Sequence, residues 1–338
     1  MLDRPDLSDE QIHVCLLDTY GLHTTGIEFL PLGYDVHAGV YRVRDADGHA
    51  YFLKVRHDTV YEPGIHVTRY LKAQGMSQVV APLPTINGAL FGQIESFAAL
   101  LYPFVTGESG MDAGLTDAQW VTYGAALRTI HETRLPDDLA HTLSTETFVP
   151  HAPALRVLRQ FQQRVEQEQF DDPLQQQLAT FWLNHHAAIR HAIEQTERLG
   201  QRLQAHRLRF VLCHADIHTN NLLLTPAGDL YIVDWDQPML APTARDLMFI
   251  LDRGIGFGPD ERQEALFFEG YGAAEVDPMA LAYYRYEWLV QDLGSFAEMV
   301  FLRHDVSEAT RQDSARLFMV QFAAGNLADI ARKLDEKI

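Results

Sequence analysis

HADIHTNN at residues 214–221 and IVDWD at residues 232–236 are the two stretches that decide the fold of this chain. Asp216 and Asn221 stand five residues apart, and Asp234 follows Asp216 by eighteen residues at the end of a second apolar run. Phosphoryl transfer from ATP needs one carboxylate to orient and deprotonate the acceptor hydroxyl, and an amide and a second carboxylate to hold magnesium on the phosphates. The three residues therefore predict the catalytic half of a kinase, with Asp216 as the base and Asn221 and Asp234 as Mg²⁺ ligands.

The residues around these motifs predict a rigid hairpin. Short apolar runs at residues 210–213, 222–224 and 230–233 are typical of strands, and a TPAGD turn at residues 225–229 joins the last two. A strand-loop-strand hairpin can hold polar side chains at one point, as catalysis by positioning requires. We therefore expect a catalytic hairpin over residues 210–236.

The alternation of His214, Asp216 and His218 leaves a second interpretation open. Such residues can ligate zinc or a two-metal centre in a hydrolase. The 16 histidines of the chain are scattered, however, and no second His-rich segment with suitable spacing completes such a site. The simpler interpretation is that His214 and His218 hydrogen-bond the catalytic loop and fix its shape.

Lys54 is the second anchor of the kinase hypothesis. Strand alternation places Phe52, Lys54 and Arg56 on one face of a strand around residues 50–55. Only four of the 27 basic residues are lysines, so a lysine inside an apolar strand suggests a specific ammonium group, such as one that pairs with ATP phosphates. Glu62, eight residues later, is a candidate ion-pair partner, although a solvated charge at the start of a helix is an alternative interpretation.

The order of the predicted elements indicates two lobes of different composition. Short strands dominate the first hundred residues, whereas the chain from about residue 116 has helical patterning apart from the catalytic hairpin. We therefore expect an α+β fold with a small β-rich nucleotide-binding lobe over residues 1–101, a hinge over residues 102–107 and a larger helical lobe over residues 108–338. Residues 32–40 contain two glycines and could cover the nucleotide phosphates or form an ordinary hairpin loop. The expected strands lie near residues 27–30, 40–44, 50–55 and 88–101. Local signals mark turns at DADG (45–48) and Asn-Gly (87–88), and capping boxes at SDEQ (8–11) and TDAQ (116–119) mark the starts of two helices.

Composition and charge disfavour several classes of function. The chain has 338 residues, of which 47% are hydrophobic, enough for one large or two modest domains. The net charge of −19 would repel duplex nucleic acid and anionic membranes, so we expect neither as a partner. The two cysteines are far apart, and no run approaches the roughly 18 apolar residues of a membrane span. We expect a soluble cytoplasmic protein without a disulfide framework.

With these residues assembled, the chain resembles the aminoglycoside phosphotransferase and choline kinase-like family, whose members are relatives of the protein kinases. The family pattern is H-x-D-x-H-x-x-N, followed by a short hairpin and I-D-[FW]-[DE]. The family also has an R-D-L segment, matched here at residues 245–247, and an L-x-x-[IL]-H helix, matched at residues 127–131. The residues that match the first two motifs are His214, Asp216, His218, Asn221, Asp234, Trp235 and Asp236.

The resemblance implies a two-lobed protein-kinase-like fold and roles for further residues. It implies that Lys54 and Glu62 anchor the phosphates of ATP, and that Asn221 and Asp234 hold Mg²⁺. It also implies that Asp246, in the R-D-L segment, braces the catalytic loop without taking part in the chemistry. The resemblance further implies that the hinge binds adenine, mainly through backbone groups. The hinge residues concerned are Tyr102, Pro103, Phe104 and Val105.

Within this family the likeness is greatest to the antibiotic kinases that phosphorylate spectinomycin, and it runs over most of the chain. It implies an ATP-dependent O-phosphotransferase that modifies a hydroxyl of an aminocyclitol or aminoglycoside antibiotic, with spectinomycin as the best candidate. The motifs do not fix the acceptor, so two alternatives stay open: a metabolic kinase of choline, homoserine or a sugar-type acceptor, and a nucleotide-binding regulatory protein with little catalysis. We expect a monomer or weak homodimer and a small cationic substrate. The carboxylates that could meet its amine are Asp216, Asp236, Glu287 and Asp292.

Overall fold

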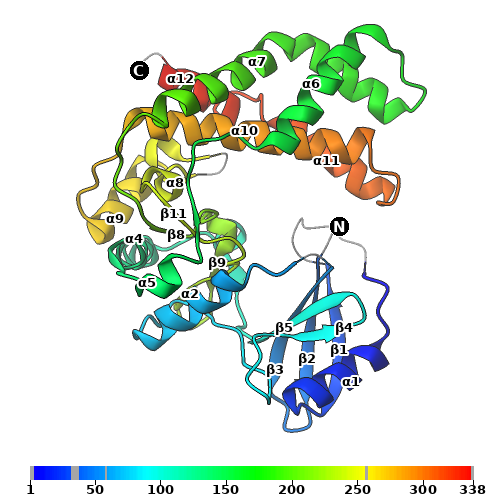
Figure 1. Cartoon of the computed structure of the whole chain (residues 1–338), viewed down its shortest axis with the longest axis vertical. Helices are drawn as coiled ribbons and strands as arrows, with labels where there is room; N and C mark the ends of the chain where they lie inside the picture. Colours follow the sequence, from blue (N-terminus) through cyan, green and yellow to red (C-terminus); the bar gives the residue numbers. More distant parts are fainter. Residues whose placement is uncertain (1–3, 32–37, 58, 256–257, 336–338) are drawn as a thin grey trace. The chain divides into compact units, whose positions relative to one another are not determined.

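The computed structural model describes residues 4–31, 38–57, 59–255 and 258–335, so residues 32–37 of the glycine-containing connection lie outside the described residues. The chain forms two compact units, coloured by sequence in Figure 1. The first unit contains the β-rich region and residues 214–236 of the catalytic hairpin, whereas residues 210–213 belong to the second unit, which also contains the two longest helices. The lobe boundaries expected from the sequence stay a prediction. The first unit comprises Met1–Leu143, His214–Pro238 and Glu269–Tyr271, and the second comprises Ser144–Cys213, Met239–Phe268 and Gly272–Ile338.

A five-stranded antiparallel sheet forms the scaffold of the first unit, with the strand order β1-β2-β3-β5-β4 (Figure 1). The turn between β2 and β3 lies where the sequence predicts it. Gly48 has a φ of 85°, and the Asp45 carboxylate accepts hydrogen bonds from the N–H groups of Asp47 and His49. The strands are β1 (Thr24–Leu30), β2 (Ala38–Asp45), β3 (Ala50–Arg56), β4 (Gly92–Ile94) and β5 (Phe97–Pro103).

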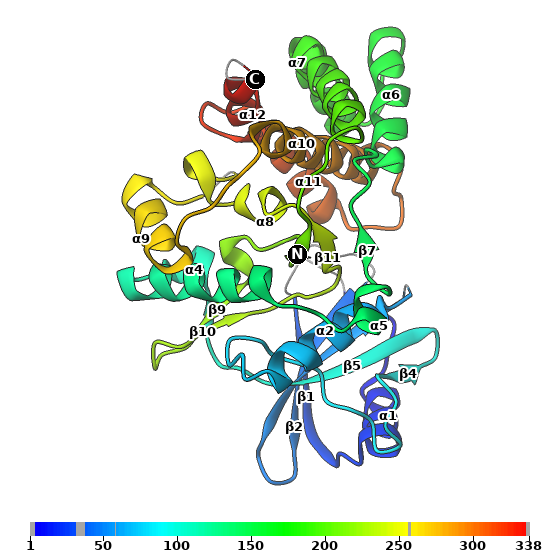
Figure 2. The same ribbon diagram turned by 60° about the vertical axis from the view of Figure 1, so that its left-hand side comes forward.

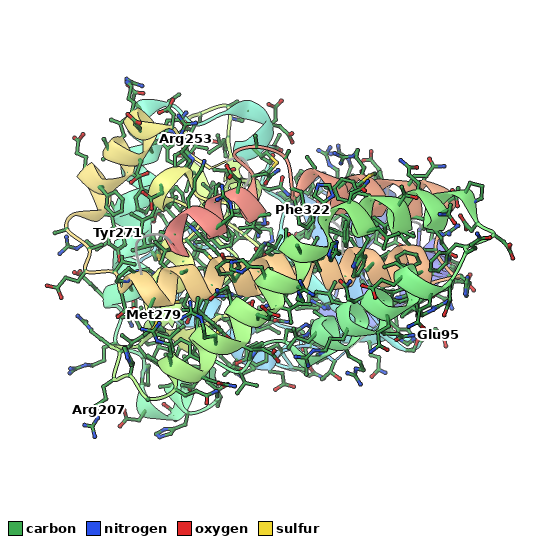
Figure 3. The ribbon with its side chains drawn as sticks, turned by 90° about the horizontal axis from the view of Figure 1, so that it is seen from above. Glu95, Arg207, Arg253, Tyr271, Met279 and Phe322 are labelled. Carbon is green, nitrogen blue, oxygen red and sulfur yellow. The ribbon has the colours of Figure 1, made fainter. Side chains whose placement is uncertain are left out.

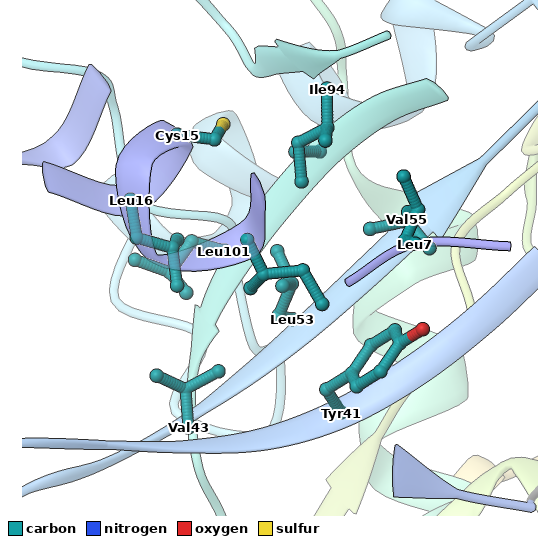
Figure 4. Packing of buried hydrophobic residues seen from close by; sticks show 11 residues of the cluster. Leu7, Cys15, Leu16, Tyr41, Val43, Leu53, Val55, Ile94 and Leu101 are labelled. Carbon is teal, nitrogen blue, oxygen red and sulfur yellow. The ribbon is translucent and has the colours of Figure 1, made fainter. Parts of the chain in front are cut away.

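Strand alternation gives this sheet an apolar face, which packs against α1 (Asp9–Tyr20). Figure 4 shows Leu53 of β3 and Tyr41 of β2 in the same cluster as Leu16 of α1 and Leu101 of β5. These four side chains are almost completely buried, so the apolar half of the β3 pattern is used for the core. The other half, which includes Lys54, therefore lies on the opposite face of the sheet.

The last two strands of the predicted catalytic hairpin form a second sheet in the first unit, whereas residues 211–213 pair in a separate sheet of the second unit. β9 (Leu222–Leu224) pairs antiparallel with β10 (Leu230–Ile232) and with β6 (Glu108–Ser109). α4 (Asp117–Glu132) packs against β10, and Figure 2 shows this helix beside the hairpin. The hydroxyl of Tyr123 on α4 donates a hydrogen bond to the carbonyl of Ile217 in the catalytic loop, so the helix also fixes the loop.

The second unit is organised around α10 (Pro278–Phe301), whose residues are mostly buried. Besides the short helix α8 (Ala244–Leu247), four longer helices pack against it within the described residues. Figure 3 shows this unit from above, with Met279 of α10 labelled. The rings of Phe161 and Phe301 stack with centroids 4.3 Å apart, which joins α10 to one of these neighbours through direct aromatic contact. The four helices are α6 (Ala152–Gln167), α7 (Pro173–Leu203), α11 (Glu308–Val320) and α12 (Leu327–Asp335).

Shorter elements complete the described structure. In the second unit β11 pairs in parallel with β7 and antiparallel with β8. None of the helices that the structure describes is both long and apolar enough to cross a membrane. The remaining elements are α2 (Glu62–Ala73), α3 (Gly110–Ala113), α5 (Asp137–Ala140), β7 (Ser144–Thr145), β8 (Val211–Cys213), β11 (Met239–Ala241), α8 (Ala244–Leu247), α9 (Glu261–Tyr271) and the 3₁₀ turns Thr219–Asn221 and Leu251–Arg253.

Candidate active site

The catalytic loop brings Asp216 and Asn221 into direct contact. The side-chain amide of Asn221 donates hydrogen bonds to the backbone carbonyl of Asp216 at 2.8 Å and to its Oδ2 at 3.1 Å. The other carboxylate oxygen, Oδ1, lies 3.2 Å from Nε2 of His218. The 3₁₀ turn at Thr219–Asn221 closes the five-residue spacing, so a single loop sets the orientation of the carboxylate.

His214 connects this loop to the segment that contains Asp234. Its Nε2 donates to the carbonyl of Val233 at 2.9 Å, and its Nδ1 accepts a hydrogen bond from the N–H of Asp216 at 3.3 Å. The imidazole also packs edge-on against the ring of Trp235. Both ring nitrogens are therefore engaged, which leaves no lone pair for a zinc ion and disfavours the metal-hydrolase alternative.

Two residues of the site adopt a backbone conformation that is costly for side chains other than glycine. Ala215 has a φ of 74° and Asp234 has a φ of 64°. Such conformations persist where the surrounding hydrogen bonds over-determine them, and they cluster at functional sites. Here they lie immediately before Asp216 and at Asp234 itself, where they help to direct the two carboxylates.

Lys54 reaches the same region from β3. Its Nζ lies 2.8 Å from Oδ1 of Asp234 and 2.8 Å from Oδ2 of Asp236. Burial alone would lower the pKa of Lys54, but the two carboxylates raise it above its ordinary value. Burial would likewise raise the pKa of Asp234, yet the Lys54 ammonium group holds that pKa below its ordinary value. The folded site therefore favours the charged forms of both Lys54 and Asp234.

The ion pair that the sequence suggested between Lys54 and Glu62 is not formed among the described residues. Lys54 binds Asp234 and Asp236 instead, and the side chain of Glu62 is exposed in the first turn of α2. Negative charge at that position is favourable because it faces the positive end of the helix dipole. The structure thus agrees with the alternative interpretation of Glu62 as a solvated helix-start residue, and its role at the phosphates stays a prediction.

The start of α2 nevertheless contacts the site through its backbone. A Cβ atom added to Gly64 would collide with the carbonyl oxygen of Trp235 and approach the ring of Pro238. Only glycine allows the helix to come this close to the segment between Asp234 and Asp236. The sequence signal was a glycine in the first turn of a helix, where it is not a favoured residue.

The predicted hinge continues directly from the sheet. Tyr102 pairs with Phe52 in the β3–β5 register, and their rings meet edge-on. The N–H of Phe104 donates to the carbonyl of Ala50 at 3.2 Å, whereas the backbone of Val105 makes no hydrogen bond within the described residues. The N–H and carbonyl of Val105 are therefore available to a ligand, whereas Pro103 has no N–H to offer.

Arg56 is a site residue to which the sequence analysis assigned no role. Its guanidinium group binds Oδ2 of Asp236, the same oxygen that accepts from Lys54. The signal was present in the alternation of β3, which places Arg56 on the same face as Lys54. The partner could not be inferred, because Asp236 is 180 residues away in the sequence.

Three of the four carboxylates suggested for a cationic substrate already have partners. Asp236 binds Lys54 and Arg56, Glu287 lies 3.6 Å from Arg245, and Asp292 accepts a hydrogen bond from Gln321 at 3.0 Å. Glu287 is also buried, and burial raises its pKa. A buried carboxylate needs a partner within the protein. These contacts are therefore explained by the stability of the fold, and they do not require a cationic substrate.

Comparison with known proteins decides the family. The model of the phosphotransferase enzyme family, APH, matches residues 27–289, which is more than half of the chain. The chain belongs to this family. The protein-kinase-like α+β fold and the transfer of phosphate to a hydroxyl, both expected from the sequence, are thereby confirmed. The chain is therefore a phosphotransferase.

The similar proteins include a spectinomycin phosphotransferase, APH(9)-Ia, solved in complex with ADP and spectinomycin. It is 31% identical to this chain, the match covers 98% of this chain and 100% of that one, and the TM-score is 0.88. Protein StrN of Streptomyces griseus is 29% identical over 259 residues, covering 72% of this chain and 74% of that protein. A microcompartment-associated aminopropanol kinase is 16% identical with a TM-score of 0.62, covering 97% and 98% of the two chains, and shares the fold.

Proposed function

We propose that this protein transfers the γ-phosphate of ATP to a hydroxyl of spectinomycin or of a closely similar aminocyclitol. The observation that carries the phosphotransferase part is the linkage of Asp216, Asn221, Asp234 and Lys54 within one compact unit by hydrogen bonds and ion pairs. The choice of acceptor is supported by the 31% identity to spectinomycin phosphotransferase over nearly the whole of both chains.

Asp216 is suited to orient the acceptor hydroxyl. Asn221 binds one carboxylate oxygen and the backbone carbonyl of the same residue, so the carboxylate cannot rotate freely. With its side chain 41% exposed, Asp216 is open to a substrate. A carboxylate fixed in this way can accept the proton of the attacking hydroxyl, which is the role of the base in phosphoryl transfer.

The residues present fit a magnesium ion. Asn221 donates through Nδ2, which leaves its Oδ1 without a hydrogen bond within the described residues, and Asp234 uses Oδ1 for Lys54 while Oδ2 makes none. Two such oxygens are the ligands that Mg²⁺ prefers. When bound, the ion would neutralise phosphate charge. Asn221 and Asp234 would hold it, and Lys54 would bind the phosphates directly.

The nucleotide base is assigned to the hinge. Val105 offers one N–H and one carbonyl without partners among the described residues, next to the edge-on pair of Phe52 and Tyr102. A base edge with one acceptor and one donor would satisfy both groups. Lys54 lies on the same sheet face as Phe52, so one surface of the first unit supplies contacts for both ends of the nucleotide.

The first experiment measures Mg²⁺-dependent ATP consumption with spectinomycin, a panel of aminoglycosides, choline and homoserine. We expect turnover with spectinomycin and a fall of about a hundred- to ten-thousand-fold in kcat for Asp216→Asn, because the variant loses the base but keeps the nucleotide site. The matched control is Asp229→Asn, in the exposed turn of the hairpin, which should retain wild-type turnover.

Other outcomes separate the alternatives. Turnover only with choline, homoserine or another acceptor would keep the kinase and discard the antibiotic. Full activity of Asp216→Asn would contradict the assignment of the base. Nucleotide binding without transfer to any acceptor would favour the regulatory protein.

A further inference from the structure

Two cations on β3 share one carboxylate oxygen. Nζ of Lys54 lies 2.8 Å from Oδ2 of Asp236, and Nη1 of Arg56 binds the same oxygen. Both cations are largely buried, with side chains 13% and 17% exposed, and the Asp236 side chain is 31% exposed. The three groups are therefore only partly screened by water, and their charges act strongly on one another.

The charges balance only when Arg56 is counted. Lys54 touches two carboxylates, Asp234 and Asp236, so these three groups alone would carry one net negative charge. Nucleotide phosphates are anionic and would be repelled from such a site. The positive charge of Arg56 makes the four groups neutral, and its contact with Asp236 means that this carboxylate keeps a cationic partner when Lys54 moves away.

We propose that Arg56 is a positioning residue that neutralises Asp236 and so frees Lys54 to bind the phosphates of the nucleotide. This inference rests on the proposed function, in which Lys54 binds those phosphates. Arg56 acts through Asp236 and needs no contact with the nucleotide. Removing the charge of Arg56 leaves Asp236 paired with Lys54 alone, which weakens nucleotide binding. Removing the charge of Asp236 as well releases Lys54 and restores nucleotide binding.

The test is a charge-rescue series measured by calorimetric titration of the full chain with MgADP. Arg56→Gln should weaken binding about tenfold, the loss expected for one unbalanced charge in a partly buried site. Asp236→Asn should bind MgADP at least as tightly as the wild type. The double variant Arg56→Gln/Asp236→Asn should return to within about threefold of the wild type, although it has lost one more native side chain.

Two further variants complete the series. Arg56→Lys keeps the positive charge and should bind within about threefold of the wild type. Arg44→Gln is the matched control, because Arg44 lies on the same face of the sheet in β2, is exposed and forms no ion pair among the described residues. It should leave MgADP binding unchanged. Thermal unfolding of each variant checks that it folds.

The results that would overturn the proposal are distinct. A double variant as weak as Arg56→Gln would mean that Arg56 binds phosphate itself or serves only the fold. Wild-type affinity in Arg56→Gln would show that its charge is irrelevant. If Arg56→Gln does not fold, Asp236→Asn decides the question alone. MgADP binding about tenfold weaker than that of the wild type in this variant would then reject the proposal. Failure of the wild type to bind MgADP would overturn the proposed function and this inference together, whereas wild-type binding without rescue overturns the inference alone.

Discussion

At Lys54, a single ammonium group lies between two carboxylates that come from a segment 180 residues away. The pair with Asp234 has opposite consequences for the two pKa values: that of Lys54 is raised and that of Asp234 is lowered, in both cases against the effect of burial. Each shift means that the folded protein favours the charged form. The ion pair therefore stabilises the first unit over the pH range in which both groups are charged.

The pH dependence of this contribution has a definite sign. Because the pKa of Asp234 is lowered on folding, its contribution is present above the ordinary aspartate pKa and is lost as the pH falls through the lower folded value. At pH 7 we expect Asp234→Asn to reduce the free energy of unfolding by about 1 kcal/mol, since a side chain 42% exposed is partly screened. Urea unfolding at pH 7 and at pH 3 should show this difference shrinking in acid. A difference that grows in acid would contradict the assignment.

Residue-level prediction from the sequence was limited by distance along the chain. The spacing within 214–221 and strand alternation around Lys54 were sufficient to select the residues that the structure brings together. The partner of Lys54 was sought nearby, at Glu62, because local spacing is all that a sequence pattern offers. The actual partners, Asp234 and Asp236, become neighbours only through the fold.

Elements were predicted well where a local chemical signal marks their ends. The structure has the capping boxes of α1 and α4 and the turn between β2 and β3 at the predicted residues. The hairpin of β4 and β5 turns between Ile94 and Phe97, however, and the Asn-Gly sequence at residues 87–88 lies in the preceding loop. A turn signal in the sequence predicts only that the chain reverses direction there. Which turn connects the two paired strands depends on the strand pairing, and the local sequence does not specify that pairing.

The contact between α6 and α10 depends on one glycine. A Cβ added to Gly294 would lie 2.6 Å from both Cα and Cβ of Ala154, so the helix backbones approach more closely than any side chain allows. We expect Gly294→Ala to lower the free energy of unfolding by about 1–3 kcal/mol, because separating packed helices costs more than the gain in helix propensity. The exposed neighbour Ser295→Ala is the control and should change stability by less than about 0.5 kcal/mol. Equal chemical-denaturation midpoints for the two variants would show that the helices can adjust freely.

At the scale of the whole molecule, the sequence identified the family because its motifs concentrate in segments that the family shares. The family match over residues 27–289 and the protein-kinase-like fold are the parts that motifs can predict. The grouping of residues 214–238 with the N-terminal region in one compact unit is a property of packing. It could not be read from the order of helices and strands, which places the hairpin among the helices.

This grouping predicts which parts of the chain a bound nucleotide should stabilise. Lys54, Val105, Asn221 and Asp234 all belong to the first unit, so MgADP should stabilise that unit directly. At about a hundred times its dissociation constant a ligand adds about 2.7 kcal/mol to the stability of the state that binds it. Amide hydrogen exchange should therefore slow in β3, β5 and residues 222–236, and stay unchanged in α6 and α11 of the second unit. Equal slowing in α6 and α11 would mean that the two units open as one cooperative block, and no slowing in β3 would contradict the assignment of Lys54 to the nucleotide.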